Sequence, residues 1–232
     1  MSAAELTLRE KCIKYRVVVC GVSGQIGAGK TTLCESLVKL YGEEMVLVRN
    51  FGDRLKEEIA FHTNDDVKQY YTHEGKNKMM PLYGMTRGTM LQKWGGAIRG
   101  VHPMAWVFAV HAWLEQQIDE RIERGLLSAT SRTDKACNLL VLLGDVRMPN
   151  ELEWIDEGCA GITIRLTGDP GAVRANSTRD LQDISETALN DCDNFAAHID
   201  TNQNGIVSTC TATVAVILAH CVRMFCTRES KN

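Results

Sequence analysis

The chain lacks the features of a nucleic-acid-binding or membrane protein. Its formal net charge is −3 over 232 residues, so no broad basic surface for nucleic acid or anionic lipid is expected. Residues 1–16 are polar and mixed in charge, unlike a signal peptide. We find no apolar run that approaches the roughly 20 residues needed to span a bilayer. We therefore expect a cytoplasmic protein that binds neither a nucleic acid polymer nor a membrane.

Metal-ligand spacings and domain linkers are also missing. The nine cysteines form no Cys-x-x-Cys pair and no Cys/His zinc pattern. Several lie in apolar stretches, which predicts reduced thiols that are buried as small hydrophobic side chains. The sequence has no internal repeat and no linker rich in proline, glycine and serine. We expect one domain over residues 16–232, preceded by a loose leader at residues 1–15.

Strands and helices are predicted to alternate along the chain. Continuous β-branched or apolar runs predict buried strands, and apolar residues three or four apart predict helices. The expected strands are residues 16–22, 45–49, 138–144, 161–166 and 196–200. The expected helices are residues 31–41, 51–61, 85–98, 104–122, 150–157 and 208–226. This alternation favours a three-layer α/β/α fold with a central, mostly parallel sheet.

A glycine-rich motif follows the first expected strand. Residues 24–31 read Gly-Gln-Ile-Gly-Ala-Gly-Lys-Thr, which matches the phosphate-binding loop (P-loop) pattern Gly-x4-Gly-Lys-Thr. Its glycines let backbone N–H groups point at phosphate oxygens, and the next helix adds its positive end. Lys30 is expected to reach the β- and γ-phosphates, and Thr31 to bind Mg²⁺. The expected ATP-binding residues of this loop are Gly24, Gln25, Ile26, Gly27, Ala28, Gly29, Lys30, Thr31 and Thr32.

Asp145 is a second candidate ligand for Mg²⁺. It follows the apolar run 139–143 and Gly144, at the carboxyl end of the strongest expected strand. A carboxylate in this position holds the metal ion of P-loop enzymes. The alternative role is an N-cap, because helix-like sequence follows Pro149.

Arginines narrow the class of enzyme. No guanine-reading Asn-Lys-x-Asp motif is present, and the size of the chain suits a small-molecule kinase. Such enzymes gather arginines around the phosphoryl groups that they handle. Arg147 lies two residues beyond Asp145, at the ligand edge of an open α/β sheet. The other candidates are Arg87 and Arg99, near the ends of one expected helix, and Arg174 and Arg179, in the charged segment 168–184, which has the composition of a lid.

Four blocks give the chain a resemblance to the deoxynucleoside monophosphate kinases of tailed-phage type, within the P-loop nucleoside monophosphate kinase fold. The first block is the P-loop. The second, residues 87–106, is similar to the family's Arg-x-x-Leu-Gln-x-x-Gly block with a later Arg and Pro-x-x-Trp. The third, Asp-Val-Arg-Met-Pro-Asn-Glu at 145–151, is similar to its Asp-x-Arg-x-x-Asn-Glu signature. The fourth is Ser185-Glu186 before Leu189.

The resemblance implies transfer of the γ-phosphoryl group of Mg²⁺-bound ATP to a deoxynucleoside 5′-monophosphate. Lys30, Asp145, Arg147 and Arg87 would then be catalytic, and Thr31 with Asp145 would hold the metal ion. A helical region at about 51–125 would bind the acceptor, and Arg174 in the lid would contact ATP. The expected acceptor-binding residues are Arg87, Gln92, Trp94, Arg99 and Asp53. The chain departs from the family pattern at Gly96, Ala97 and Ile184 and in segment 128–136, and the resemblance does not specify which base is accepted.

Other interpretations of the same residues remain open. Residues 186–195 resemble a stretch of the animal phosphomevalonate kinases, although the P-loop differs from theirs. Dephospho-coenzyme-A kinase and a non-catalytic nucleotide switch are further alternatives. Trp94 suits core packing as well as stacking on a base. The support for Asp53 as a contact of the acceptor sugar is weaker than the support for the arginines as contacts of the acceptor phosphate. The sequence is compatible with a monomer or a homodimer.

Overall fold

A computed structural model of the chain describes residues 6–129, 136–168 and 180–226. Its central sheet has five parallel strands in the order β2-β5-β1-β6-β7. The strands are β1 (Val17–Gly24), β2 (Val46–Arg49), β5 (Leu139–Val146), β6 (Ile162–Leu166) and β7 (Ala197–Ile199). A separate two-stranded antiparallel sheet consists of β3 (Met79–Met80) and β4 (Met85–Thr86). The expected parallel sheet is therefore confirmed.

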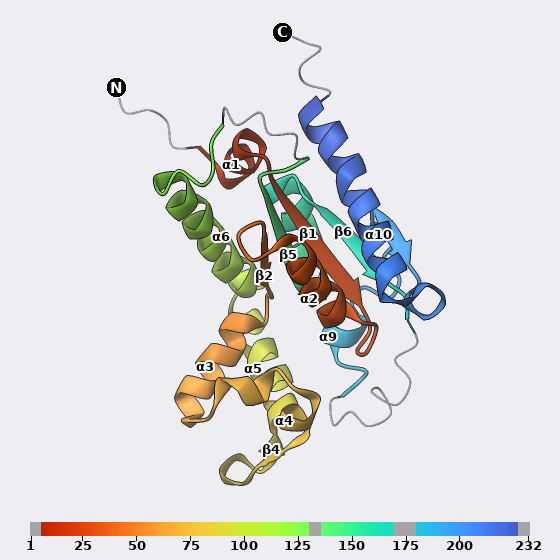
Figure 1. The fold of residues 1–232 in the computed structure, drawn as a ribbon. Helices are drawn as coiled ribbons and strands as arrows, with labels where there is room; N and C mark the ends of the chain where they lie inside the picture. Colours follow the sequence, from red (N-terminus) through yellow and green to blue (C-terminus); the bar gives the residue numbers. More distant parts are fainter. Residues whose placement is uncertain (1–5, 130–135, 169–179, 227–232) are drawn as a thin grey trace.

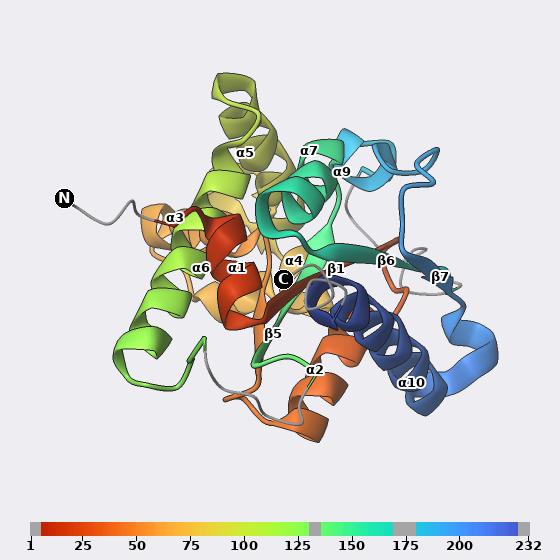
Figure 2. The ribbon, with the colours of Figure 1, turned by 90° about the horizontal axis from the view of Figure 1, so that it is seen from above.

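Helices cover both faces of the central sheet (Figures 1 and 2). The helices are α1 (Leu8–Tyr15), α2 (Lys30–Tyr41), α3 (Asp53–Thr63), α4 (His73–Asn77), α5 (Arg87–Val101), α6 (Ala105–Glu123), α7 (Pro149–Glu153), α9 (Ile184–Thr187) and α10 (Thr201–Cys221), which is interrupted at Gly205. Short 3₁₀ turns lie at Val67–Tyr70 and Pro81–Tyr83, and π turns at Trp154–Gly158 and Val222–Cys226. The expected three-layer α/β/α architecture is thus present.

Alternate residues of the two central strands build two cores. Val17 and Val19 of β1 pack with α1, α3, α5 and α6 on one face. Val18 and Cys20 pack with α2 and α10 on the other face. Successive side chains of a strand point to opposite faces, and β1 is buried on both, which explains its unbroken run of β-branched residues.

The N-terminal segment is more ordered than its composition predicts. Residues 8–15 form α1, whose Thr7 and Glu10 side chains exchange hydrogen bonds with each other's backbone N–H groups. Leu8 and Cys12 are buried, and Lys11 forms an ion pair with Asp119 of α6 at 2.8 Å. The expectation of a loose leader is therefore wrong for residues 8–15, because a capping box and two buried side chains hold them as a helix.

The C-terminal helix is longer and more apolar than expected. Between Gly205 and Phe225 it is long and apolar enough to cross a membrane by length and composition, and only part of this stretch is buried. The expectation that no apolar run reaches this length is wrong here, because Thr and Ala residues extend the run that Val and Ile begin. Ile217 and Cys221 of this helix pack on the sheet, as the core helix of a globular domain does.

Candidate active site

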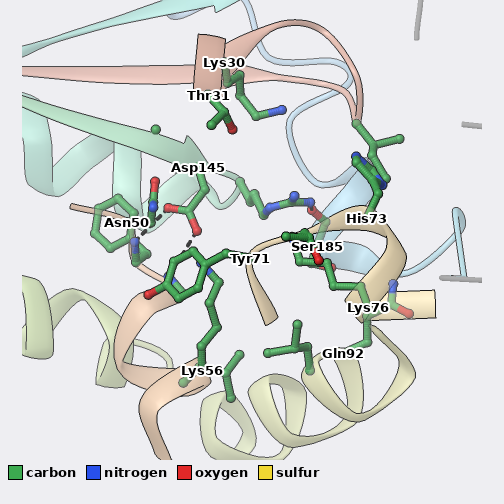
Figure 3. A pocket seen from close by; sticks show the side chains of 18 of the residues that line it. Lys30, Thr31, Asn50, Lys56, Tyr71, His73, Lys76, Gln92, Asp145 and Ser185 are labelled. Atoms are coloured by element: carbon green, nitrogen blue, oxygen red, sulfur yellow. Dashed lines mark hydrogen bonds between the residues drawn. The ribbon is translucent and has the colours of Figure 1, made fainter. Parts of the chain in front are cut away.

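A cavity of about 470 Å³ opens at the carboxyl ends of β1, β5 and β2 (Figure 3). This edge is where open α/β sheets bind ligands. One side is formed by the P-loop and the start of α2, and the other sides by the turn before α3, segment 71–77, α5 and the end of β5. Five cationic side chains line it: Lys30, Lys56, Lys76, Arg99 and Arg147. Its lining has two carboxyl groups, those of Asp145 and Glu151.

The backbone of the P-loop depends on its glycines. Gly24 has φ of 145°, and a Cβ there would lie 2.7 Å from the carbonyl oxygen of Leu166. Gly29 has φ of 88° and precedes the first residue of α2. An L side chain would be strained at both positions. The glycines thus let the loop turn tightly from the end of β1 into α2.

Lys30 lies across its own loop. Its Nζ donates to the carbonyl oxygens of Gly24 at 2.6 Å and Gln25 at 2.8 Å. Thr31 and Thr32 follow in the first turn of α2 and also line the cavity. Because an N-terminal turn of a helix presents backbone N–H groups without intrahelical partners, this end of the cavity suits an anion.

Asp145 is held by the turn that precedes α3. Its Oδ1 accepts from the Phe51 N–H at 2.7 Å, and its Oδ2 from the Gly52 N–H at 3.1 Å. The alternative role as the cap of the helix after Pro149 is wrong, because Met148 occupies the N-cap position of α7. Each carboxylate oxygen keeps a lone pair for a further ligand. Figure 3 shows Asp145 below Thr31 at the same end of the cavity.

Asp53 does not line the cavity. It is buried and accepts the Asn50 N–H at 2.8 Å and the Lys56 Nζ at 2.8 Å. Burial acts to raise the pKa of Asp53, but the Lys56 ammonium and the Asn50 donors hold that pKa below its ordinary value. Of Asp53 and Lys56, it is Lys56 that lines the cavity, and its Nζ lies 4.1 Å from the centre of the Tyr71 ring.

Arg147 joins β5 to the segment that begins at α9. Its Nη1 donates to the Ser185 carbonyl oxygen at 2.9 Å and forms an ion pair with Glu186 at 2.6 Å. Burial opposes the charge of Arg147, but Glu186 and Asp145 hold its pKa above the ordinary value. Glu151 accepts the N–H groups of Arg147 and Met148 at 2.7 and 3.1 Å. Burial, with the nearby Asp145 carboxylate, raises the pKa of Glu151 to about 8.

The two arginines of α5 lie in different surroundings. Arg99 lines the cavity, and its guanidinium forms no hydrogen bond or ion pair with another residue of the described ranges. Burial lowers the pKa of its guanidinium, although Glu151 and Asp183 act in the opposite direction. Arg87 is outside the cavity lining and binds Asp65 through two hydrogen bonds of 2.6 and 3.0 Å. Of the two arginines expected to bind the acceptor, the structure places Arg99 in the cavity.

Gln92 and Trp94 also differ in position. Gln92 lines the cavity, and its amide group exchanges hydrogen bonds with the backbone of Asp180, at 2.8 Å to the carbonyl oxygen and 3.0 Å from the N–H. Trp94 stacks on His62 with ring centres 5.5 Å apart and is absent from the cavity lining. Trp94 therefore has the packing role that the sequence left open. Arg174 and Arg179 lie outside the described residues.

Several cavity residues escaped the sequence interpretation. They are Asn50, Lys56, Tyr71 and Lys76, which Figure 3 labels around the cavity together with His73. Asn50 had a usable signal, because it directly follows β2 at the ligand edge of the sheet. Lys56 had none, since a lysine followed by two glutamates on a helix is typical of a solvated face. The others come from segment 71–77, where no periodicity fixes which side chains point inward.

Comparison with known proteins does not place this chain in a family. No family model matches it. No curated protein matches it either. Among solved structures it is similar to the crystal structure of TT1252 from Thermus thermophilus, with 14% identity and a TM-score of 0.40 over 88% of this chain and 97% of that chain. Because the TM-score lies below 0.5, this likeness supports no statement about function.

Proposed function

We propose that the protein transfers the γ-phosphoryl group of ATP to the phosphate of a deoxynucleoside 5′-monophosphate, giving ADP and the diphosphate. The observation that carries the proposal is the cavity itself. The P-loop, with Lys30 and Thr31, shares one space with Arg99 and Arg147, which come from α5 and β5. A kinase needs two phosphate sites of this kind facing each other across a short gap.

The donor would bind along the P-loop. The N–H groups of the loop and of the first turn of α2 would hold the β-phosphate. Lys30 would leave the carbonyl oxygens of Gly24 and Gln25 and turn to the phosphate oxygens, which are stronger acceptors because they are charged. Lys30 thus has one set of partners on the loop and would gain a second set on the nucleotide.

The residues present suit a magnesium ion. The Thr31 hydroxyl and the Asp145 carboxylate offer hard oxygen ligands at one end of the cavity. The described ranges contain no cluster of three or more His, Cys, Asp or Glu residues that would form a complete protein cage. Mg²⁺ in kinases takes one or two protein oxygens and completes its shell with phosphates and water. When bound, it would neutralise the charge between the transferring phosphates.

The acceptor phosphate would bind to Arg99. This guanidinium faces the cavity without a hydrogen-bonded protein partner among the described residues, so it can give both of its parallel N–H groups to a phosphate. Arg147 is fixed by Ser185 and Glu186 and would stabilise charge on the transferring group. The choice of a deoxynucleotide rests on the resemblance of the 87–106 and 145–151 blocks to the phage-type kinases.

The reaction requires little proton chemistry from the protein. The acceptor phosphate is already ionised at neutral pH, so its oxygen can attack without a strong general base. The five cationic side chains of the cavity would neutralise the negative charge that develops in the transition state. Asp145 and Arg147, which are held in fixed positions, would align donor and acceptor. Catalysis by this site is therefore a matter of positioning and charge neutralisation.

ADP release, measured in a coupled assay with Mg²⁺-ATP, tests the proposal. The acceptors are the four deoxynucleoside monophosphates, their ribose counterparts and phosphomevalonate. We expect turnover that depends on a deoxynucleotide and disappears in Lys30→Met. Turnover with phosphomevalonate alone would assign a different acceptor. Slow ATP hydrolysis that no acceptor stimulates would contradict a kinase and indicate a nucleotide switch.

A further inference from the structure

The turn of residues 50–53 connects the acceptor-side helix α3 to Asp145. Its backbone is closed by the Asp53 N–H, which donates to the Asn50 carbonyl oxygen at 3.1 Å. The Asp53 carboxylate closes it a second time by accepting the Asn50 N–H at 2.8 Å and the Asn50 Nδ2 at 3.2 Å. Between these two ends, the Phe51 and Gly52 N–H groups point at the two oxygens of Asp145.

The turn fits tightly against the end of β5. A Cβ at Gly52 would lie 3.1 Å from Asp145 Oδ2, and a Cβ at Gly144 would lie 2.8 Å from Asn50 Oδ1. The Phe51 ring is buried edge-on against Trp154, with centres 5.9 Å apart. The position of the Asp145 carboxylate therefore depends on the position of the turn, because contacts on both sides leave little room for either to move alone.

Lys56 completes the arrangement. Its Nζ lies 2.8 Å from Asp53 Oδ1 on one side and 4.1 Å from the centre of the Tyr71 ring on the other. The side chains of Asp53 and Lys56 are 8% and 12% exposed, so this ion pair is largely shielded from water. A shielded pair with a second set of hydrogen bonds holds its geometry better than a surface pair does.

We propose that Asp53, supported by Lys56, is a positioning residue for Asp145. By fixing the 50–53 turn it aims two backbone amides at the carboxylate. This would orient the remaining lone pairs of Asp145 for the metal ion that Thr31 and Asp145 would hold. This role rests on the proposed function, in which Asp145 helps to hold Mg²⁺. Partners that orient a metal ligand commonly change metal affinity by about 10- to 100-fold when they are removed.

The test measures metal binding without turnover. Mn²⁺ replaces Mg²⁺, the non-hydrolysable analogue AMP-PNP replaces ATP, and free Mn²⁺ is followed by electron paramagnetic resonance. We expect Asp53→Ala to weaken Mn²⁺ binding in the ternary complex by about tenfold. Asp53→Asn keeps an acceptor for the Asn50 N–H and should lose less, as should Lys56→Met. Glu58→Gln makes the same charge change on α3, away from the cavity lining, and should match the wild type.

A second readout needs no nucleotide. Amide hydrogen exchange at Phe51 and Gly52 should speed up in both Asp53→Ala and Asp145→Asn, while amides in the middle of α3 stay protected. Unchanged exchange at Phe51 and Gly52 in Asp53→Ala would overturn the inference, as would wild-type Mn²⁺ affinity in that variant. Failure of the wild-type protein to bind Mn²⁺ with AMP-PNP would overturn the proposed function instead.

Discussion

Lys30 shows how a charged side chain at this site is held by the loop itself. Its ammonium group donates hydrogen bonds to two carbonyl oxygens of the loop, those of Gly24 and Gln25. A phosphate would replace neutral acceptors with charged ones, which form stronger hydrogen bonds. The side chain can therefore change partners without leaving its charge unsatisfied.

Lys30→Met should abolish most turnover and leave the fold intact. Removing one preorganised charge from a phosphoryl-transfer site costs about 10²- to 10³-fold in kcat. The hydrogen bonds that are lost are partly exposed, so we expect the thermal midpoint to change little. Kinetics and thermal melts of Lys39→Met, an exposed lysine of the same helix, provide the matched control. Near-normal kcat in Lys30→Met would contradict the role of the loop.

Arg99→Gln and Arg87→Gln should have different effects. Losing the Arg99 guanidinium removes charged hydrogen bonds worth about 1.5–3 kcal/mol, so the KM for the acceptor should rise roughly 10- to 100-fold, with the KM for ATP unchanged. Arg87→Gln leaves Asp65 without its ion-pair partner and should mainly lower the thermal midpoint. Steady-state kinetics and melts of both variants separate the roles. If Arg87→Gln instead raised the KM for the acceptor and Arg99→Gln only lowered the thermal midpoint, Arg87 would be assigned to the acceptor site.

Glu151 should make stability fall as pH rises. Its folded-state pKa of about 8 lies above its ordinary value, so between pH 5 and pH 8 the unfolded chain releases a proton that the folded chain keeps. The free energy of unfolding should fall there by up to roughly 1 kcal/mol per pH unit, with no further loss above pH 8. Glu151→Gln removes this slope, whereas Glu153→Gln on the exposed side of α7 keeps it. Urea denaturation at several pH values measures this slope. If the free energy of unfolding depended on pH in the same way in both variants, the assignment would be contradicted.

At the scale of elements, strands and long helices were the predictable part. The run of residues 138–144 predicted β5 to within two residues, and the apolar stripe of 104–122 predicted α6 to within one. Both are regular because burial imposes a period on many residues at once. The segment 62–85 divides into α4, two strands of two residues each and two 3₁₀ turns, which are too short to show a period.

The same limit applies to the candidate site. The P-loop, Asp145 and Arg147 were predictable because strand ends and a spaced motif define them. The partners of Asp145 and Arg87 were not, since Phe51 and Asp65 meet them through the tertiary packing of α3. A sequence shows which charges exist near a site, but an ion pair such as Arg87–Asp65 decides which of them can face a ligand.

Two adjacent glycines of α5 should respond differently to alanine. A Cβ at Gly96 meets nothing within 4 Å, so Gly96→Ala should stabilise the protein by about 0.5–1 kcal/mol through helix propensity. A Cβ at Gly95 would lie 3.0 Å from Leu55 Cδ2 of α3, which offsets that gain. Urea denaturation of the two variants gives the comparison. Equal stabilisation would show that α3 and α5 pack less closely than they do here.

At the scale of the whole molecule, two cores cover the two faces of the sheet, and the cavity opens at its carboxyl edge. The face that packs α3, α5 and α6 carries the side of the cavity proposed for the acceptor, and the face that packs α2 and α10 carries the P-loop. Donor and acceptor sites would therefore sit on different layers and meet at Asp145 and Arg147, which line the cavity at the carboxyl end of β5.

Phosphorus NMR of a single reaction mixture tests this account most directly. The protein is incubated with Mg²⁺-ATP and each deoxynucleoside monophosphate in turn. The account predicts that the γ-phosphate signal of ATP is replaced by the signals of ADP and the deoxynucleoside diphosphate in equal amounts, with no inorganic phosphate. Inorganic phosphate without a diphosphate product, or unchanged ATP with every acceptor, would contradict it.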